Sequence, residues 1–263
     1  MKLRFLGTGT SFGIPVIGCQ CPACTSSDPH DQRTRHGALI CSDDRSRILL
    51  IDTPPELRQQ LLAARVNHID AVWFTHAHAD HTHGIDDVRV FCSDPGSRLP
   101  LYADAECAEN LLSRFDYIFD ESRRAPGGPR AVVELRIIQR DQPAHIAGFE
   151  LMPLPVPHGG TTVYGFRVAD LGYITDAKQL TQTVLERLVG VRVLVLNALW
   201  FGRPHPTHLN IEEAIELARS IGAEITYLTH LTHRVTHAEL LKKLPAGILP
   251  AHDGLEVQLT PDP

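Results

Sequence analysis

A dense group of histidine and aspartate residues directly follows one short apolar run. Residues 71–74 read A-V-W-F, and residues 75–84 read T-H-A-H-A-D-H-T-H-G. The apolar run predicts a buried strand, so the polar residues stand at the end of that strand. Four side chains suited to a borderline cation such as Zn²⁺ fall within this segment: His76, His78, Asp80 and His81. The motif therefore predicts a catalytic metal site at a sheet edge, with His83 as a supporting or surface residue.

Composition narrows the class of protein. The chain has 263 residues, 15 of them histidine, with 43% hydrophobic and 21% charged residues, which suits a globular core. A formal net charge of −6 argues against a surface that coats nucleic acid. Because no apolar run reaches the length that spans a bilayer, we expect no membrane segment.

The N-terminus only imitates an export signal. Residues 16–19 read V-I-G-C, like a lipoprotein cleavage box, but Arg4, Pro15 and three glycines interrupt the stretch before it. We therefore expect a cytoplasmic protein whose cysteines are reduced.

Residues 19–24 read C-Q-C-P-A-C and form a cysteine cluster. Cys19, Cys21 and Cys24 are three soft ligands suited to a structural Zn²⁺, with three free buried thiols as the alternative. Iron–sulfur binding is disfavoured because no second cysteine cluster exists; Cys92 and Cys107 read as core residues. Spacing alone leaves the fourth ligand open among His30, His36, Cys41 and His233.

Short β-rich runs recur along the chain and predict strands. They are Leu3–Leu6, Ile48–Ile51, Ala71–Phe74, Leu99–Tyr102, Val132–Ile138, Phe149–Leu154, Tyr164–Val168, Leu171–Ile174, Val193–Leu196, Ile225–Leu228 and Leu255–Leu259. Capping boxes at Thr53, Asn210 and Thr236 predict three helices, the first ending near Ala64. Weaker helices are expected at 105–113 and 178–188, and residues 122–129 read as a loop. The pattern predicts a single α/β domain over residues 1–263, with two sheets and helices outside.

An H-x-H-x-D-H string after a strand resembles the signature of the metallo-β-lactamase superfamily. Four further segments resemble that family's motifs in the right order: Leu50–Asp52, Pro155–Gly159, Tyr173–Asp176 and Tyr227–His230. The Thr-Pro-Pro after Asp52 is atypical. The resemblance implies a four-layer αββα sandwich and a site for two divalent metals, Zn²⁺, Mn²⁺ or Fe²⁺. His76, His78 and His158 would bind one metal, Asp80, His81 and His230 the other, and Asp176 would bridge them.

The cysteine cluster resembles one branch of that superfamily, which contains the cyclic phosphodiesterase of bacterial phosphonate breakdown. In that branch the second histidine of a T-H-x-x-H segment completes the structural zinc site, which implies His233 here. Pyrroloquinoline-quinone biosynthesis B proteins carry a similar cysteine cluster but resemble a degenerate version of the metal motif. The intact H-A-H-A-D-H of this chain disfavours them. By position, His208 resembles the branch histidine that assists the leaving group, with His205 as its competitor. The candidate catalytic residues are thus His208 and Asp80.

The resulting functional hypothesis is a dinuclear hydrolase that cleaves small or cyclic phosphodiesters with a metal-bridging hydroxide. A lactone, thioester or β-lactam hydrolase of the same fold is one alternative, and a non-catalytic metal-binding protein of a cofactor pathway is another. A transfer-RNA nuclease is disfavoured because no long Lys/Arg-rich insertion is visible. The expected partner is a small-molecule substrate, without nucleic acid or membrane, and the branch is often dimeric.

Several other residues carry open interpretations. Arg203 would suit a phosphate but reads equally well as an exposed loop residue. Aromatic side chains would wall a cleft or fill the core: Phe115, Tyr117, Phe119, Trp200 and Phe201. The run Gly7–Gly13 imitates a dinucleotide fingerprint, but no clear helix follows it. His252 reads as a surface residue before the Asp253-Gly254 turn.

Overall fold

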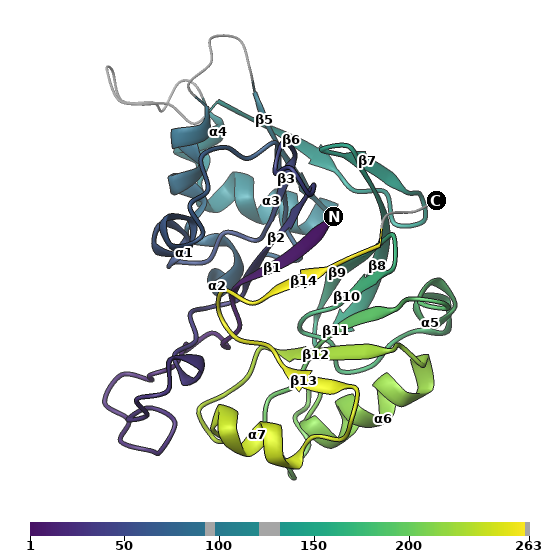
Figure 1. Cartoon of the computed structure of the whole chain (residues 1–263). Helices are drawn as coiled ribbons and strands as arrows, with labels where there is room; N and C mark the ends of the chain where they lie inside the picture. Colours follow the sequence, from purple (N-terminus) through teal and green to yellow (C-terminus); the bar gives the residue numbers. More distant parts are fainter. Residues whose placement is uncertain (93–97, 121–131, 261–263) are drawn as a thin grey trace.

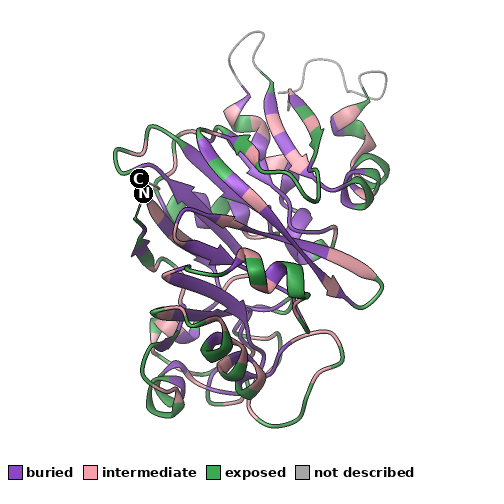
Figure 2. Cartoon of the chain, turned by 90° about the vertical axis from the view of Figure 1, so that its right-hand side faces the viewer, coloured by how far each residue is buried: buried purple, intermediate pink, exposed green. Residues whose placement is uncertain are grey.

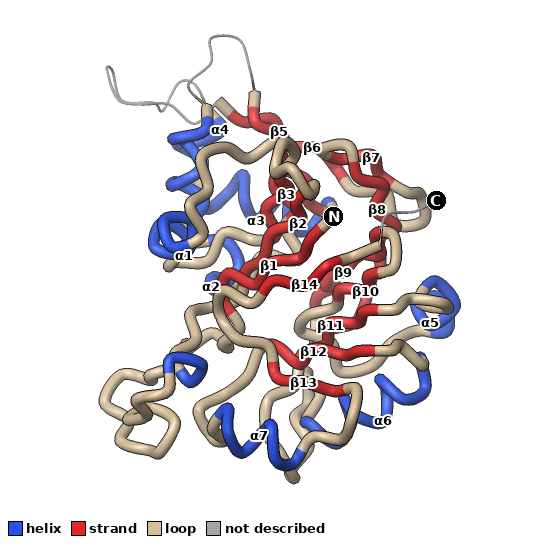
Figure 3. The backbone as a smooth tube through the Cα atoms, viewed as in Figure 1, coloured by secondary structure: helices blue, strands red, loops and turns tan. Residues whose placement is uncertain are grey.

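Two seven-stranded sheets face each other in a computed structural model, which describes residues 1–92, 98–120 and 132–260. Figure 1 shows helices on the outer side of each sheet, and Figure 3 shows the same layers by secondary structure. The α/β class and the four-layer αββα sandwich are confirmed. The expected loop at 122–129 lies outside the described residues. Among the described helices, none is both long and apolar enough to cross a bilayer.

The first sheet runs β14 (Glu256–Gln258), β1 (Lys2–Gly7), β2 (Gly37–Cys41), β3 (Ile48–Ile51), β4 (Ala71–Trp73), β5 (Leu99–Ala103) and β6 (Val133–Ile137). The second runs β13 (Ile248–Pro250), β12 (Ile225–Thr229), β11 (Val193–Asn197), β10 (Leu171–Tyr173), β9 (Thr161–Val168), β8 (Phe149–His158) and β7 (Ala144–Ile146). The chain forms β1–β6 in the first sheet and β7–β13 in the second, and its last strand, β14, returns to the first sheet. Every predicted strand is present within a residue or a few at its ends. The strands β2, β7 and β13 were not predicted. β7 and β13 have only three residues each, and β13 ends on proline, whereas β2 begins with Gly-Ala, which are poor strand formers.

The main core lies between the sheets. Trp73 and Phe166, from opposite sheets, meet there with their ring centroids 5.6 Å apart. Outside the first sheet pack α1 (Leu57–Ala63), α3 (Ala105–Arg114) and α4 (Asp116–Phe119); outside the second pack α5 (Gln182–Arg187), α6 (Ile211–Ile221) and α7 (His237–Lys243). Figure 2 shows buried strands and helices whose outer faces are exposed. Strands covered on both faces are apolar throughout, as in Ile48–Ile51.

Two of the three predicted capping boxes are confirmed. Asn210 and Thr236 each accept the N–H three residues on, and the glutamate at that position accepts the cap's own N–H. The box at Thr53 was wrong: α1 begins at Leu57 without a side-chain cap. The Thr53 hydroxyl instead donates to the carbonyl of Thr82 at 3.1 Å, because this segment braces the histidine loop.

Parallel pairing decides where the polar strand ends meet. β3, β4 and β5 are parallel, as are β10, β11 and β12. The carboxyl ends of parallel strands lie at one edge of a sheet. The segments after β3, β4, β10 and β12 therefore converge at a single edge of the sandwich, where the candidate ligands stand.

Candidate metal centre

The histidine loop leaves β4 and turns into the single-turn helix α2 (Ala79–Thr82). His76 and His81 are buried, whereas His78 is exposed. The Nε2 of His76 lies 2.9 Å from Nδ1 of His78. His158, at the end of β8, completes a group of three imidazoles whose donor atoms all lie within 4.8 Å of one another.

A second group lies beside the first. Asp80, His81 and His230 bring their donor atoms within 4.8 Å of one another. Asp176 stands between the two groups: its Oδ2 is 3.2 Å from Nε2 of His81, and its Oδ1 is 3.0 Å from Nε2 of His230. The structure therefore brings together all seven residues that the resemblance named as ligands.

Three residues at this edge adopt left-handed backbone conformations although none is glycine. The φ angles are 61° at Asp52, 52° at Asp176 and 56° at His230. Such conformations are uncommon outside glycine and cluster at functional sites. Asp52 and His230 directly follow β3 and β12, and Asp176 lies three residues after β10. Each turns its side chain into the site at the cost of some backbone strain.

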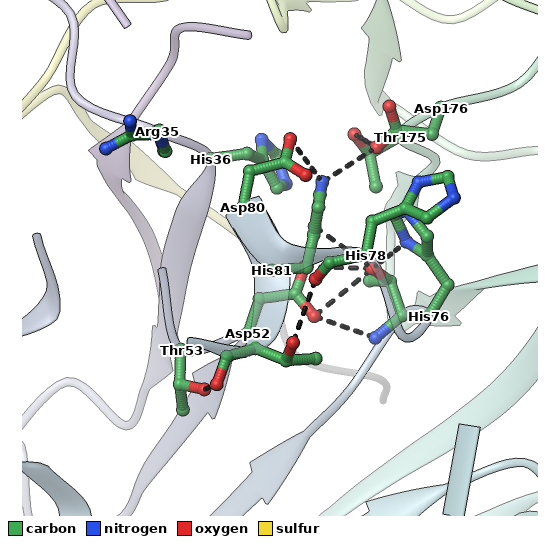
Figure 4. A network of polar contacts seen from close by, with 12 residues as sticks. Arg35, His36, Asp52, Thr53, His76, His78, Asp80, His81, Thr175 and Asp176 are labelled. Atoms are coloured by element: carbon green, nitrogen blue, oxygen red, sulfur yellow. Dashed lines mark hydrogen bonds and ion pairs between the residues drawn. The ribbon is translucent and has the colours of Figure 1, made fainter. Parts of the chain in front are cut away.

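Asp52 supports the centre from behind. Its carboxylate is fully buried and accepts the N–H of Thr75 at 2.8 Å, and its Oδ2 lies 2.7 Å from Nδ1 of His81. A carboxylate on one imidazole nitrogen fixes the ring so that the other nitrogen faces a metal. Figure 4 shows Asp52 on one side of His81 and the two carboxylates of Asp80 and Asp176 on the other.

The donor set fits divalent cations. Among the residues that the structure describes, Nε2 of His81 is buried without a hydrogen-bond partner, although two carboxylates face it at 3.2 and 3.4 Å. Burial disfavours the charged form of His81, but Asp80, Asp52 and Asp176 together raise its pKa well above the usual value. Burial lowers the pKa of His230 to about 4, so its ring is neutral and offers a lone pair. A divalent cation bound here would displace the proton of His81, because borderline metals bind the neutral imidazole nitrogen beside ionised carboxylates.

The cysteine cluster meets one histidine. Nδ1 of His233 lies 3.2, 3.3 and 3.6 Å from the sulfurs of Cys19, Cys21 and Cys24. Of the four candidates left open for the fourth ligand, His233 is the one that the structure brings to the sulfurs within the described residues. His233 lies three residues after His230 in the same loop, and the N–H of Leu231 donates to the carbonyl of Thr8 at 3.0 Å.

The cluster holds a thiolate near neutral pH. Burial raises the pKa of Cys21, but hydrogen bonds from the backbone of Cys24 and from the neighbouring side chains outweigh this effect and lower the pKa to about 6. Burial raises the pKa of Cys24 to about 11. Since the thiolate is the metal-binding form, the cluster is prepared to bind a soft cation.

Two of the remaining candidate fourth ligands, His36 and His30, make other contacts. His36 is buried with its Nε2 2.7 Å from the hydroxyl of Tyr173, and its ring lies 5.4 Å from that of His81. His30 packs against His237 and His252 with ring centroids 4.8 and 4.3 Å away. Sequence reasoning missed the placement of His36 behind the metal centre, because a lone histidine before a short strand carries no local signal.

Comparison with known proteins gives the family. The family model described as "Beta-lactamase superfamily domain" matches residues 47–231. The chain belongs to the beta-lactamase superfamily. A crystal structure of a diphosphatase from the PhnP family is 39% identical, covers 97% of this chain and 96% of its own, and superposes with a TM-score of 0.89. The superfamily fold and this likeness support a metal-dependent hydrolase.

Three other proteins are similar to this chain. An octanoyltransferase from Porphyromonas gingivalis is 37% identical over 97% of this chain, and the chain spans about half of that protein, 51%. Coenzyme PQQ synthesis protein B from Methylobacterium nodulans is 33% identical over 75% of this chain and 72% of that protein. A Zn²⁺-bound PqqB from Methylobacterium extorquens shares the fold at 20% identity, with a TM-score of 0.79 over 98% of this chain and all of its own.

The two loop histidines of this superfamily member, His208 and His205, make different contacts. Nε2 of His208 lies 2.8 Å from Oδ1 of Asp176, whereas Nδ1 of His205 faces Thr207 and His208. Arg203 is exposed and its carbonyl accepts the indole N–H of Trp200.

The aromatic candidates divide between core and surface. Phe115, Phe119 and Phe201 pack against core clusters. Tyr117 is 46% exposed, and Trp200 lies beside His205 with ring centroids 5.7 Å apart. His83 is exposed, as expected of a residue beyond the motif.

The glycine run Gly7–Gly13 and the turn after His252 have structural roles. The glycine loop bridges to Arg35 and Leu231 through Gly9 rather than opening a helix. Asp253 lies in the expected turn, and it accepts the N–H groups of Thr8 and Thr34 at 2.9 and 2.7 Å. His252 is partly buried against the ring of His30.

Proposed function

We propose that this metal-dependent hydrolase is a phosphodiesterase that acts on small or cyclic phosphodiesters at a dinuclear centre. The observation that carries the proposal is the position of His208, whose Nε2 lies 2.8 Å from the carboxylate between the two ligand groups. We propose that the imidazole N–H at this position donates to the leaving oxygen. Cleavage of a phosphodiester needs such a donor because the departing alkoxide is basic.

The ligand assignment follows the two groups. We propose that His76, His78 and His158 hold one metal, that Asp80, His81 and His230 hold the other, and that Asp176 joins them. Divalent ions held there would lower the pKa of water and stabilise charge on phosphoryl oxygens. His and Asp ligands suit Zn²⁺, Mn²⁺ and Fe²⁺ alike, so the ligand set does not select one of these metals.

The chain's own residues prepare the site for this chemistry. Asp80 stays ionised because His81 lowers its pKa below the ordinary range, against the effect of burial. We propose that Asp80 orients the attacking water as well as binding metal. Asp52 keeps Nε2 of His81 aimed into the centre. We propose that Cys19, Cys21, Cys24 and His233 bind a structural Zn²⁺ that holds the loop of His230.

A diphosphatase is the second candidate. It is favoured by the 39% identity to a diphosphatase of the PhnP family over nearly all of both chains. Both reactions attack phosphorus and differ in the leaving group, an alcohol in one and a phosphate in the other. A phosphate leaves with less help from an acid, so the two candidates make different demands on His208.

The deciding experiment combines metal analysis with a substrate panel. The metal content per chain of purified protein is measured. Hydrolysis of bis(p-nitrophenyl) phosphate, a 2′,3′-cyclic nucleotide, a diphosphate ester, a lactone and a thioester is then assayed before and after chelation. Three metals with chelator-sensitive diester cleavage, weakened in His208→Ala, support the proposal. Preference for the diphosphate ester with an unaffected His208→Ala favours the second candidate. Cleavage of only the lactone or thioester, or no turnover with metals bound, contradicts both.

A further inference from the structure

Thr207 contacts three histidines at the edge of the candidate metal centre. Its carbonyl accepts from Nδ1 of His158 at 3.1 Å. Its backbone N–H donates to Nδ1 of His205 at 3.3 Å, and its hydroxyl oxygen lies 3.0 Å from Nδ1 of His208. One residue therefore touches a proposed metal ligand, the proposed leaving-group histidine and that histidine's neighbour.

The contacts assign the protons on His208. Oδ1 of Asp176 lies 2.8 Å from Nε2 of His208, and an ionised carboxylate only accepts hydrogen bonds. Nε2 of His208 must therefore carry a proton. In the neutral ring Nδ1 is then a lone pair that needs a donor.

The Thr207 hydroxyl is the group that meets this need. Nδ1 of His205 lies 3.3 Å from Nδ1 of His208, but its lone pair already accepts the backbone N–H of Thr207. Two lone pairs repel rather than bond. The hydroxyl oxygen lies 3.0 Å from Nδ1 of His208 and 3.3 Å from Nδ1 of His205. Because Nδ1 of His205 already accepts an N–H, the single hydroxyl proton is assigned to the closer nitrogen, Nδ1 of His208.

We propose that Thr207 is a positioning residue that holds His208 in the tautomer with its proton on Nε2. The opposite tautomer would aim a lone pair at the centre and would have no proton to give. The catalytic consequence rests on the proposed function, whereas the tautomer itself is a property of the folded chain. The carbonyl of the same residue fixes His158 with its other nitrogen, Nε2, free to face a metal.

Substitutions at Thr207 can separate the effect of its hydroxyl from the effect of its shape. A Cβ built at Gly159 would lie 3.3 Å from Cγ2 of Thr207, so the methyl group of Thr207 packs closely there. Thr207→Val keeps a methyl group in that place and removes the donor. Thr207→Ser keeps the donor and removes the methyl group. Thr232→Val is a matched control, because the hydroxyl of Thr232 donates at 2.8 Å to the carbonyl of Leu199 and does not meet His208.

Nitrogen NMR tests the tautomer without any substrate. Protein labelled with ¹⁵N-histidine and produced with zinc is recorded at about pH 8, above the usual histidine pKa. His208 is assigned by its loss in His208→Gln. We expect the Nε2–H signature in wild type, Thr207→Ser and Thr232→Val, and a mixture with Nδ1–H in Thr207→Val. An Nδ1–H signature in wild type, or no change in Thr207→Val, overturns the proposal.

Leaving-group kinetics test the consequence. Methyl p-nitrophenyl phosphate releases a stable anion, whereas methyl phenyl phosphate releases a basic one that needs a proton. For Thr207→Val we expect kcat on the phenyl ester to fall about tenfold and kcat on the nitrophenyl ester to change less than about twofold, with KM unchanged. Thr207→Ser should restore the phenyl activity, and Thr207→Val should add no loss to His208→Ala. Equal losses on both esters would mean a merely structural role.

The two tests also distinguish failure of the proposed function from failure of the inference about Thr207. If wild type cleaves neither ester, the proposed function fails, and the NMR result still decides the role of Thr207. If wild type cleaves both esters and Thr207→Val leaves their ratio unchanged, the inference fails while the phosphodiesterase stands.

Discussion

Replacing Asp52 by Asn should weaken metal binding without unfolding the chain. Asp52 is fully buried, and its Oδ2 lies 2.7 Å from Nδ1 of His81. Asparagine tolerates the left-handed backbone that Asp52 adopts, with φ at 61°, and has nearly the same shape. The substitution therefore changes charge and hydrogen bonding with little change in backbone strain.

The magnitude follows from the hydrogen bonds at stake. The single amide oxygen of Asn cannot accept from both Thr75 and His81, which donate to different oxygens of Asp52. If the amide NH₂ faces His81, the ring must move its proton to Nε2 and lose the lone pair that would bind metal. A buried hydrogen bond to a charged group contributes about 2 kcal/mol, which corresponds to about thirtyfold in affinity. Supporting residues behind metal ligands show losses of about 10–100-fold.

The assay is zinc binding by competition with a chromophoric chelator, together with metal content after dialysis and the thermal midpoint. We expect Asp52→Asn to bind zinc at the candidate centre about thirtyfold more weakly. Asp70→Asn is the matched control: Asp70 accepts the N–H of Ile48 at 2.6 Å on the same sheet, away from the histidine loop. It should bind zinc like wild type.

An affinity of Asp52→Asn within about threefold of wild type, with both variants folded, would refute the reasoning. It would mean that the ring of His81 is oriented by its packing alone. Equal weakening in Asp70→Asn would instead show a general effect of losing a carboxylate on this sheet.

Three further predictions concern the cysteine cluster, a buried histidine and a helix cap. Cys21→Ser should bind one metal fewer per chain and lose about 3 kcal/mol of stability at saturating zinc, read by metal analysis and thermal unfolding; an unchanged metal count would contradict the site with His233. Burial, then the positive charge of Arg33, lowers the pKa of His237 to about 4. Because the unfolded chain binds that proton first, stability should fall as pH drops from about 6.5 to about 4, by about 3 kcal/mol, and His237→Gln should flatten this part of the urea-unfolding profile; equal pH slopes in the two proteins would disprove the assignment. Asn210→Ala should cost about 1 kcal/mol in urea unfolding, since it removes the capping box of α6, and no measurable loss would show that packing alone sets the start of that helix.

The sequence alone determined the features that depend on near neighbours. Strand positions such as Ile48–Ile51 and the caps at Asn210 and Thr236 follow from periodicity and side-chain chemistry within a few residues. The ligand motif at 76–81 follows from adjacent residue types at a strand end. Where a local rule failed, as at Thr53, a tertiary contact had taken the hydroxyl for the histidine loop.

Tertiary structure decided the relations across long distances in the chain. His233 meets Cys21, 212 residues away, and Asp176 stands between His81 and His230 because parallel strands of two facing sheets end at the same edge. No local pattern encodes such a meeting, since it depends on sheet register and on how the sheets pack. The roles of Thr207 and His36 arise in the same way: an ordinary residue gains its chemistry from the side chains that the fold places beside it.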